Sequence, residues 1–133
     1  MQLIPYVHFN GNCEEALNTY RDIFDGTYDQ INRFASAPFP TPDDYKDKVM
    51  HVQLSFAGNS IMMSDTMPDN KIEYGNGIVL SVGLTDVEKT KTIFTKLSEG
   101  GAVTMPLEKQ FWGAWFGQLT DRFGIRWMFN CEG

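Results

Sequence analysis

The chain lacks the features that mark membrane, secreted and nucleic-acid-binding proteins. Its 133 residues contain no apolar run of about 18 residues or more, and the N-terminus shows no basic stretch followed by an apolar one. The formal net charge of −6 disfavours nucleic acid and anionic membranes, because both attract a basic patch. We therefore expect a cytoplasmic protein with neither a membrane nor a nucleic-acid partner.

Metal-ligating and nucleophilic side chains are also scarce. The chain has two histidines, His8 and His51, and two cysteines, Cys13 and Cys131. Without an export signal, the cysteines are interpreted as free thiols. Cys13 falls in the first turn of a predicted helix, where the helix dipole lowers a thiol pKa, so a nucleophilic Cys13 is an alternative to a small structural residue. No Walker-type loop and no G-x-G-x-x-G motif occurs.

The most informative stretch that is present lies in the last third of the chain, FWGAWFGQLTDRFGIRWMFNCE. Two apolar, aromatic runs, Ala114–Leu119 and Ile125–Cys131, flank the polar and glycine-containing turn Thr120–Gly124. Aromatic residues suit a half-buried pleated surface, and Asp followed closely by Gly closes a turn. The pattern therefore predicts a β-hairpin.

The second strand of this hairpin has one apolar face and one mixed face. The apolar face should be core and consists of Ile125, Trp127, Phe129 and Cys131. The other face carries a cation, a thioether and an amide, on Arg126, Met128 and Asn130. A face that only contacts solvent does not need this mixture of side chains. The mixture therefore predicts the wall of a ligand cavity, with a chemically mixed core face as the alternative.

The first half of the chain predicts a strand, a helix and three further strands. The helix begins after Asn12, with Glu15 completing a capping box, and stops at Gly26. The strands are expected at Leu3–Phe9, Thr27–Ala35, Met50–Phe56 and Ser60–Ser64.

The pattern then begins again. A strand at 78–84 precedes a helix that Asp86 caps, and a strand from Ala102 to about Met105 leads through the loop Pro106–Gln110 to the hairpin. Tyr20 lines up with Phe94 when the two halves are superposed. The sequence thus predicts an α+β fold of two tandem βαβββ modules, residues 1–66 and 76–133, joined by a polar linker at 67–75. Each module is expected to curl a sheet around one half of a cleft.

Three stretches resemble one known family. FWGAWFGQLTDRFGIRWMFNCE, PYVHFNGNCEEALNTYRDIFDG and GNSIMMSDTMP are similar to the PhnB-like branch of the vicinal oxygen chelate superfamily and run in its order across nearly the whole chain. That superfamily includes glyoxalase I, extradiol dioxygenases and the bleomycin and fosfomycin resistance proteins. The resemblance implies the glyoxalase/bleomycin resistance/dioxygenase-like fold. It also implies a homodimer, because half-open sheets leave strand edges unpaired.

In metalloenzymes of this superfamily, the first and last strand of each module supply ligands to a divalent ion, usually His, Glu or Gln. The matching positions in this chain are Pro5, Met62, Gly77 and Met128, none of which is a plausible ligand. His8 lies at an odd offset from Pro5 and is expected on the opposite face, hydrogen-bonded beside the first helix, unless a bulge turns it into a ligand. His51 is expected in the pocket. We therefore predict no metal and no other cofactor.

The sequence supports neither methyl transfer nor a Ser-His-Asp triad strongly. Some relatives of this branch carry a label linking them to ubiquinone methylation, but an adenosylmethionine site needs a glycine-rich turn after a first strand, and Gly75-Asn76-Gly77 precedes a strand instead. The label is not supported by the sequence. A triad of Ser64, His51 and Asp65 is an alternative that the adjacency of Ser64 and Asp65 at a strand end disfavours.

What remains is a pocket with apolar walls and a few hydrogen-bonding groups, the usual lining of a small-molecule site. The expected ligand-binding residues are His51, Gln53, Ser55, Met62, Ser64, Val79, Ser81, Gln118, Met128 and Asn130, with Trp112 or Trp115 at the rim. We predict a metal-independent protein that binds a small organic molecule and resembles the bleomycin-resistance type. The alternatives are a divalent-metal-dependent lyase, glyoxalase or dioxygenase, and a folded dimer without a ligand.

Overall fold

The computed structural model describes all 133 residues, which form two compact units, residues 1–73 and 74–133. The boundary falls inside the stretch 67–75 that was predicted as a linker. Asn10 fastens this stretch to the first strand and helix, since its side chain accepts a hydrogen bond from the Ile72 N–H (2.7 Å) and donates one to the Ile72 carbonyl oxygen (3.1 Å). Neither helix is long and apolar enough to cross a membrane.

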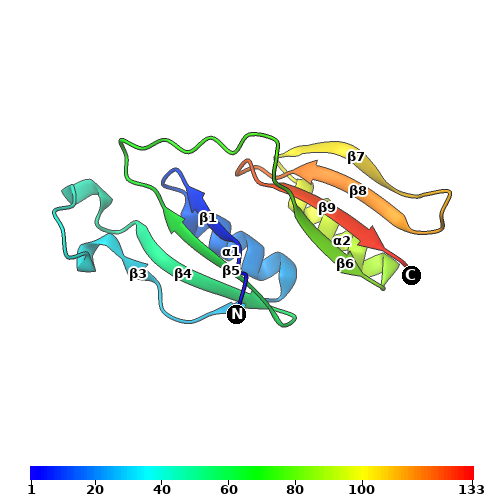
Figure 1. Cartoon of the computed structure of the whole chain (residues 1–133), viewed down its shortest axis with the longest axis horizontal. Coiled ribbons are helices and arrows are strands. Elements are labelled where there is room, and N and C mark those ends of the chain that lie inside the picture. Colours follow the sequence, from blue (N-terminus) through cyan, green and yellow to red (C-terminus); the bar gives the residue numbers. More distant parts are fainter. The chain divides into compact units, whose positions relative to one another are not determined.

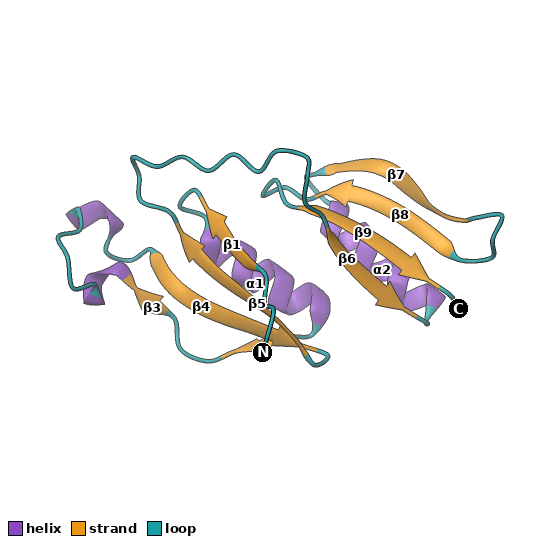
Figure 2. Cartoon of the chain, in the orientation of Figure 1, coloured by secondary structure: helices purple, strands orange, loops and turns teal.

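The first unit packs one helix against one face of a mostly antiparallel sheet (Figures 1 and 2). The strand order is β1-β5-β4-β2, with β3 also paired to β4 and with β1 parallel to β5. In chain order the elements are β1 (Tyr6–Phe9), α1 (Cys13–Phe24), β2 (Thr27–Tyr28), β3 (Asn32–Arg33), two 3₁₀ turns (Phe34–Ser36 and Asp43–Tyr45), β4 (Val49–Phe56) and β5 (Asn59–Asp65).

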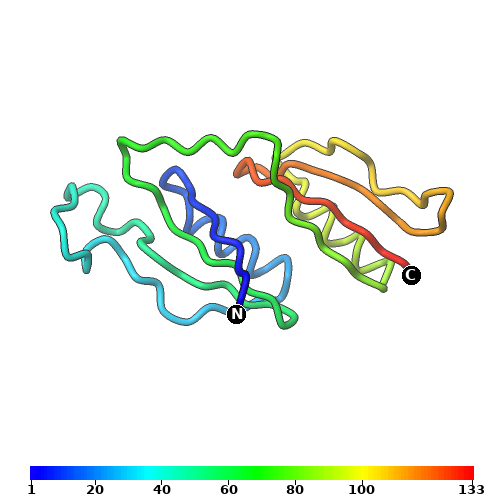
Figure 3. Tube along the Cα trace, viewed as in Figure 1, coloured from blue at the N-terminus to red at the C-terminus, as the bar shows by residue number.

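The second unit repeats this arrangement. Its strand order is β6-β9-β8-β7, and β6 runs parallel to β9 although the two are far apart in sequence (Figure 3). The elements are β6 (Leu80–Leu84), α2 (Val87–Ser98), β7 (Ala102–Lys109), β8 (Trp115–Thr120) and β9 (Arg126–Cys131). In both units the first strand lies beside the last, so the predicted α+β fold of tandem βαβββ modules is confirmed.

Helix and strand periodicity together build each core. In α1 the buried side chains recur at a spacing of three or four residues, which places them on one stripe of the helix. In β4 the buried residues alternate, with Val52 and Leu54 turned to the helix and Phe24 of α1 stacked on Phe56 (ring centroids 4.5 Å apart). The largest fully buried side chains of this core are Phe9, Leu17, Tyr20, Leu54 and Met63. Each contributes about 1.5–3 kcal/mol by leaving water.

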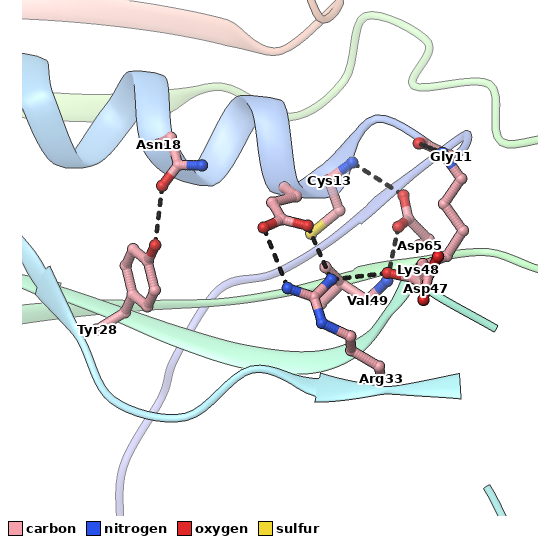
Figure 4. A network of polar contacts seen from close by, with 10 residues as sticks. Gly11, Cys13, Asn18, Tyr28, Arg33, Asp47, Lys48, Val49 and Asp65 are labelled. Carbon is pink, nitrogen blue, oxygen red and sulfur yellow. Dashed lines mark hydrogen bonds and ion pairs between the residues drawn. The ribbon is translucent and has the colours of Figure 1, made fainter. Parts of the chain in front are cut away.

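The start of α1 is capped from a distant strand. Asn12 makes no side-chain capping bond, so the predicted capping box is wrong. Instead Asp65, at the end of β5, accepts the Cys13 N–H on Oδ1 and the Val49 N–H on Oδ2, each at 2.9 Å (Figure 4). A carboxylate at a helix N-terminus is favourable because the dipole is positive there. Asp65 thereby joins α1, β4 and β5.

A second charged contact ties α1 to the following segment. Arg33 donates to both carboxylate oxygens of Glu14, at 2.8 and 3.1 Å, and also to the Asp47 carbonyl oxygen at 2.7 Å (Figure 4). The hydrogen bonds from this guanidinium hold the pKa of the Glu14 carboxyl below its usual value.

Two predicted strands have other bounds in the structure. The stretch Thr27–Ala35 is broken into β2 and β3 and then turns into a 3₁₀ segment, because this bend buries Phe34 against Tyr45 (ring centroids 5.5 Å apart). The strand expected to stop near Met105 continues through Pro106 to Lys109. Pro106 is tolerated because β7 is an edge strand, where a missing N–H breaks no necessary ladder bond.

The C-terminal hairpin is organised by one buried carboxylate. Asp121 Oδ1 accepts the backbone N–H groups of Phe123 (2.9 Å) and Ile125 (3.0 Å), and Oδ2 accepts the indole N–H of Trp127 (2.9 Å). Residues along β9 alternate between half-buried and buried, so the predicted hairpin and the predicted core face are confirmed.

Candidate functional site

Each sheet has one face against its helix and one face turned away from it, which we call the open face of that unit. In the first unit, the stacking of Phe24 on Phe56 identifies the helix side of β4, and strand alternation assigns the other side chains. The open face of the first unit carries Tyr6, His8, His51, Gln53, Ser55, Met62 and Ser64. Five of these seven residues are sequence-predicted site residues.

Two imidazoles on this open face are each in contact with a hydroxyl. His8 Nδ1 lies 2.8 Å from Ser64 Oγ, and His51 Nδ1 lies 3.0 Å from the Tyr6 hydroxyl oxygen. The Tyr6 ring contacts both imidazoles, with centroid separations of 4.9 Å to His8 and 5.6 Å to His51. The four side chains form one aromatic and polar cluster, which can offer hydrogen bonds and a ring face to a ligand.

The predicted orientation of His8 is wrong. It was expected beside the first helix, but β1 pairs Tyr6 with Met62 and His8 with Ser64, which sets both β1 side chains on the open face. Alternation counted from Pro5 gives His8 the wrong face, because Pro5 lies before β1 begins and does not share its regular alternation.

The same register corrects the positions that correspond to metal ligands. Tyr6 lies beside Met62, and Ser81 lies beside Met128, in place of the predicted Pro5 and Gly77. A phenol, a hydroxyl and two thioethers are poor donors for a hard or borderline divalent ion, which takes imidazole, carboxylate or thiolate ligands. No three His, Cys, Asp or Glu side chains are grouped so that they could hold a metal ion. The residues at these four positions therefore do not fit the metal that the superfamily implies.

A depression of about 290 Å³ lies at the β2–β4 side of the first unit. It brings together three predicted site residues, His51, Gln53 and Ser55, and does not include Met62 or Ser64. Sequence reasoning missed its other lining residues, which are Thr27, Tyr28, Asp29 and Gln30. These follow α1 directly, and no alternation pattern marks them because β2 is only two residues long.

In the second unit, Phe94 of α2 contacts Phe129 edge-on (centroids 5.6 Å apart), which identifies the helix side of β9. Alternation then places the neighbouring residues of β9 and their cross-strand partners on the open face. The open face of the second unit carries Ser81, Phe116, Gln118, Thr120, Arg126, Met128 and Asn130. Phe116 was missed because its neighbour Trp115 was expected at the pocket, and neighbouring residues of a strand point to opposite faces.

A second depression, of about 210 Å³, lies within this unit. It brings together the predicted residues Val79 and Gln118, but not Ser81, Met128 or Asn130. The complete lining is Asn76, Gly77, Val79, Thr104, Gln118, Leu119, Thr120, Arg126 and Trp127. Arg126 stood on the mixed face in the sequence but was left out of the predicted site.

The two tryptophans expected at the rim line neither depression. Trp115 pairs with the buried Cys131 and lies on the helix side, where Lys91 Nζ of α2 is 4.7 Å from its ring centroid, so its predicted place is wrong. Trp112 lies in the exposed β7–β8 loop, edge-on to Phe111 at a centroid distance of 4.9 Å.

One pair of side chains recurs on both open faces. Gln53 of β4 pairs across the ladder with Met62 of β5, and Gln118 of β8 pairs with Met128 of β9. β4 and β8, like β5 and β9, hold equivalent places in their sheets. The neighbouring strand differs, because the first unit has Tyr6 and His8 where the second has Ser81 and Gly83.

The nucleophilic alternatives do not match the geometry. Burial, followed by the negative charges of Asp65 and Glu14, raises the pKa of the Cys13 thiol, so the thiolate is disfavoured, and the buried side chain favours a structural Cys13. The triad is wrong as well. Asp65 is engaged by two backbone N–H groups in the core, and Ser64 contacts His8 instead of His51.

Comparison with known proteins gives a consistent family. A family model described as 3-demethylubiquinone-9 3-methyltransferase matches residues 1–129. Protein YjdN of Escherichia coli is 32% identical over 140 residues, covering 98% of this chain and 95% of its own length.

Solved structures agree with this assignment. Protein PA1353 from Pseudomonas aeruginosa is 41% identical with a TM-score of 0.89, covering 99% of this chain and 98% of its own. A putative 3-demethylubiquinone-9 3-methyltransferase, PhnB protein, from Bacillus cereus is 26% identical with a TM-score of 0.84, covering 98% and 99%. A glyoxylase/bleomycin resistance protein/dioxygenase domain from Frankia sp. EAN1pec shares the fold at 14% identity, with a TM-score of 0.68 and coverage of 98% and 91%.

Proposed function

The chain belongs to the PhnB-like family within the vicinal oxygen chelate superfamily, and on that premise we propose that it binds a small organic molecule on its open faces without a metal. The observation that carries the proposal is the repeated Gln–Met pair of Gln53 with Met62 and Gln118 with Met128. An amide supplies a donor and an acceptor, and a thioether makes adaptable apolar contacts. Both are what an irregular organic ligand requires.

We also propose that the methyl transfer named in the family description is not an activity of this chain. The doubly wound fold that holds a dinucleotide at a glycine-rich turn has a mostly parallel sheet with helices on both faces. Here each sheet is mostly antiparallel and packs its single helix on one face. The β1–α1 connection, Asn10-Gly11-Asn12, has a single glycine, and the Gly11 carbonyl oxygen accepts a hydrogen bond from Lys48 Nζ at 2.7 Å. The residues present do not fit that cofactor.

A ligand screen by thermal shift tests the proposed function. A panel of planar aromatic and heteroaromatic compounds with hydrogen-bonding groups is added to protein in a chelating buffer. A compound at about 100 times its dissociation constant adds roughly 2.7 kcal/mol to the free energy of unfolding. Gln118→Ala should weaken the effect of a stabilising compound, whereas Gln110→Ala, in the β7–β8 loop, should not. A panel without any stabilising compound, or equal losses in the two variants, contradicts the proposal.

Metal removal should leave the protein unchanged. We expect no stoichiometric zinc, nickel, manganese or iron in purified protein, and an unchanged melting temperature after chelation, because a site-bound ion adds folding free energy. Elemental analysis and a melting curve with and without chelator measure both. One tightly held ion per chain, lost in His8→Ala or His51→Ala, contradicts the expectation.

We also propose that the protein is a homodimer. Both sheets have unpaired edge strands, and β7 leaves eight residues along one of them, with Val103 47% and Met105 42% exposed. Unpaired edges and exposed apolar side chains are usually covered by another chain. Light scattering at micromolar concentration should give twice the chain mass of 15.1 kDa. The single-chain mass under these conditions contradicts this.

A further inference from the structure

The depression of the second unit contains one charged residue, Arg126. It lies on β9 directly across the ladder from Thr120 of β8, on the open face. No aspartate or glutamate lines the depression, although the chain has 17 acidic residues against 11 lysines and arginines. The Arg126 guanidinium is therefore a cation with no acidic side chain among the residues that line the depression.

The Arg126 guanidinium has no carboxylate partner. Arg21, Arg33, Lys46 and Lys91 each lie within 4 Å of an acidic side chain, whereas Arg126 forms no such ion pair. The hydrogen bond that Arg126 does make runs from Nη1 to the carbonyl oxygen of Asn76, at 3.2 Å. A guanidinium has five N–H donors, so this contact orients the group and leaves most of its donors for another acceptor.

The residues around Arg126 in the depression add further hydrogen-bond donors. Thr104, Gln118 and Thr120 line the depression with two hydroxyls and an amide, all able to donate, and Val79 adds an apolar wall. A planar guanidinium matches the two oxygens of a carboxylate in a paired hydrogen-bonding geometry. The volume of about 210 Å³ accommodates a carboxylate joined to one small ring.

We propose that this depression binds the carboxylate of a small organic ligand, with Arg126 as the anchoring cation. The inference rests on the proposed function and narrows its ligand to the class of organic acids. It predicts that the affinity of a ligand for this depression depends more on its negative charge than on its ring.

The test uses benzoate and its neutral, similarly shaped analogue benzamide. Each is titrated into ¹⁵N-labelled full-length protein, and amide chemical shifts are followed at Gln118, Thr120 and Arg126. Benzoate should shift these amides and benzamide should not. Arg126→Gln should weaken benzoate binding roughly tenfold or more, because a charged hydrogen-bonding partner is lost. Arg126→Lys should weaken it less.

Arg122→Gln is the matched control, since it removes an arginine from the turn of the same hairpin, where it stacks on Phe123 outside the depression. It should leave benzoate binding unchanged. Equal shifts with benzoate and benzamide, retained in Arg126→Gln, would overturn the carboxylate inference and leave the proposed function standing. Inorganic phosphate competing as well as benzoate would overturn the restriction to organic acids. No shift with either probe overturns the inference, and the compound panel then decides the proposed function separately.

Discussion

Trp127→Ala should lower the free energy of unfolding by about 3–5 kcal/mol or prevent folding. Trp127 is 1% exposed, and its indole N–H donates to Asp121 Oδ2 at 2.9 Å. Alanine would leave a large cavity and remove one of the hydrogen bonds that hold the Asp121 carboxylate in the turn. Met128→Ala, one residue further along β9, should cost well below the roughly 2–5 kcal/mol of a buried Met→Ala change, because Met128 lies on the open face.

Met63→Ala is the matched control for this comparison. Met63 is fully buried on the helix side of β5, so the same chemical change should there cost about 2–5 kcal/mol. Denaturant titration of the three variants gives the free energies directly. Equal losses at Met128 and Met63 would show that Met128 is core, and the open face of the second unit would then be misassigned.

Asp65→Ala should lower the free energy of unfolding by roughly 2–5 kcal/mol, because it leaves two buried backbone N–H groups without an acceptor. These are the N–H groups of Cys13, at the start of α1, and of Val49, at the start of β4. Asn12→Ala should change stability by about 0.5 kcal/mol or less, since the Asn12 side chain makes no capping bond. Sequence rules alone would assign the capping role to Asn12, so the two variants distinguish the local cap from the distant one.

The measurement is a denaturant titration of both variants, followed by circular dichroism of the helical signal. A large loss in Asn12→Ala with a small one in Asp65→Ala would restore the local capping box. Asp65→Asn adds a finer comparison, because it keeps one carbonyl oxygen as an acceptor and should fall between the two.

Alternation predicted the sheet face of those candidate site residues whose place depends on a single strand. Gln53, Met62, Gln118 and Met128 all lie on open faces, because each stands in a strand long enough for period two to be read from its own residues. The hairpin was predictable for the same reason, together with its Asp121-to-Gly124 turn. The tandem organisation followed from the repetition of this pattern.

Long-range pairing decided what the sequence could not show. His8 was misplaced because its face depends on where β1 begins, and that is set by pairing with Met62 and Ser64 of β5. Trp115 was misplaced because its partner Cys131 is 16 residues away across the hairpin, which fixes its face. The Asp65 cap joins residues 52 positions apart, and no local motif encodes it.

The central claim is that a small organic molecule binds to this chain without a metal. Native mass spectrometry of chelated protein, mixed with a stabilising compound from the panel, tests it most directly. We predict a complex whose mass equals protein plus compound, with no metal ion and with the same occupancy when zinc, nickel or manganese is added. A complex that forms only after a divalent ion is supplied, or that carries such an ion in equal stoichiometry, would contradict the account.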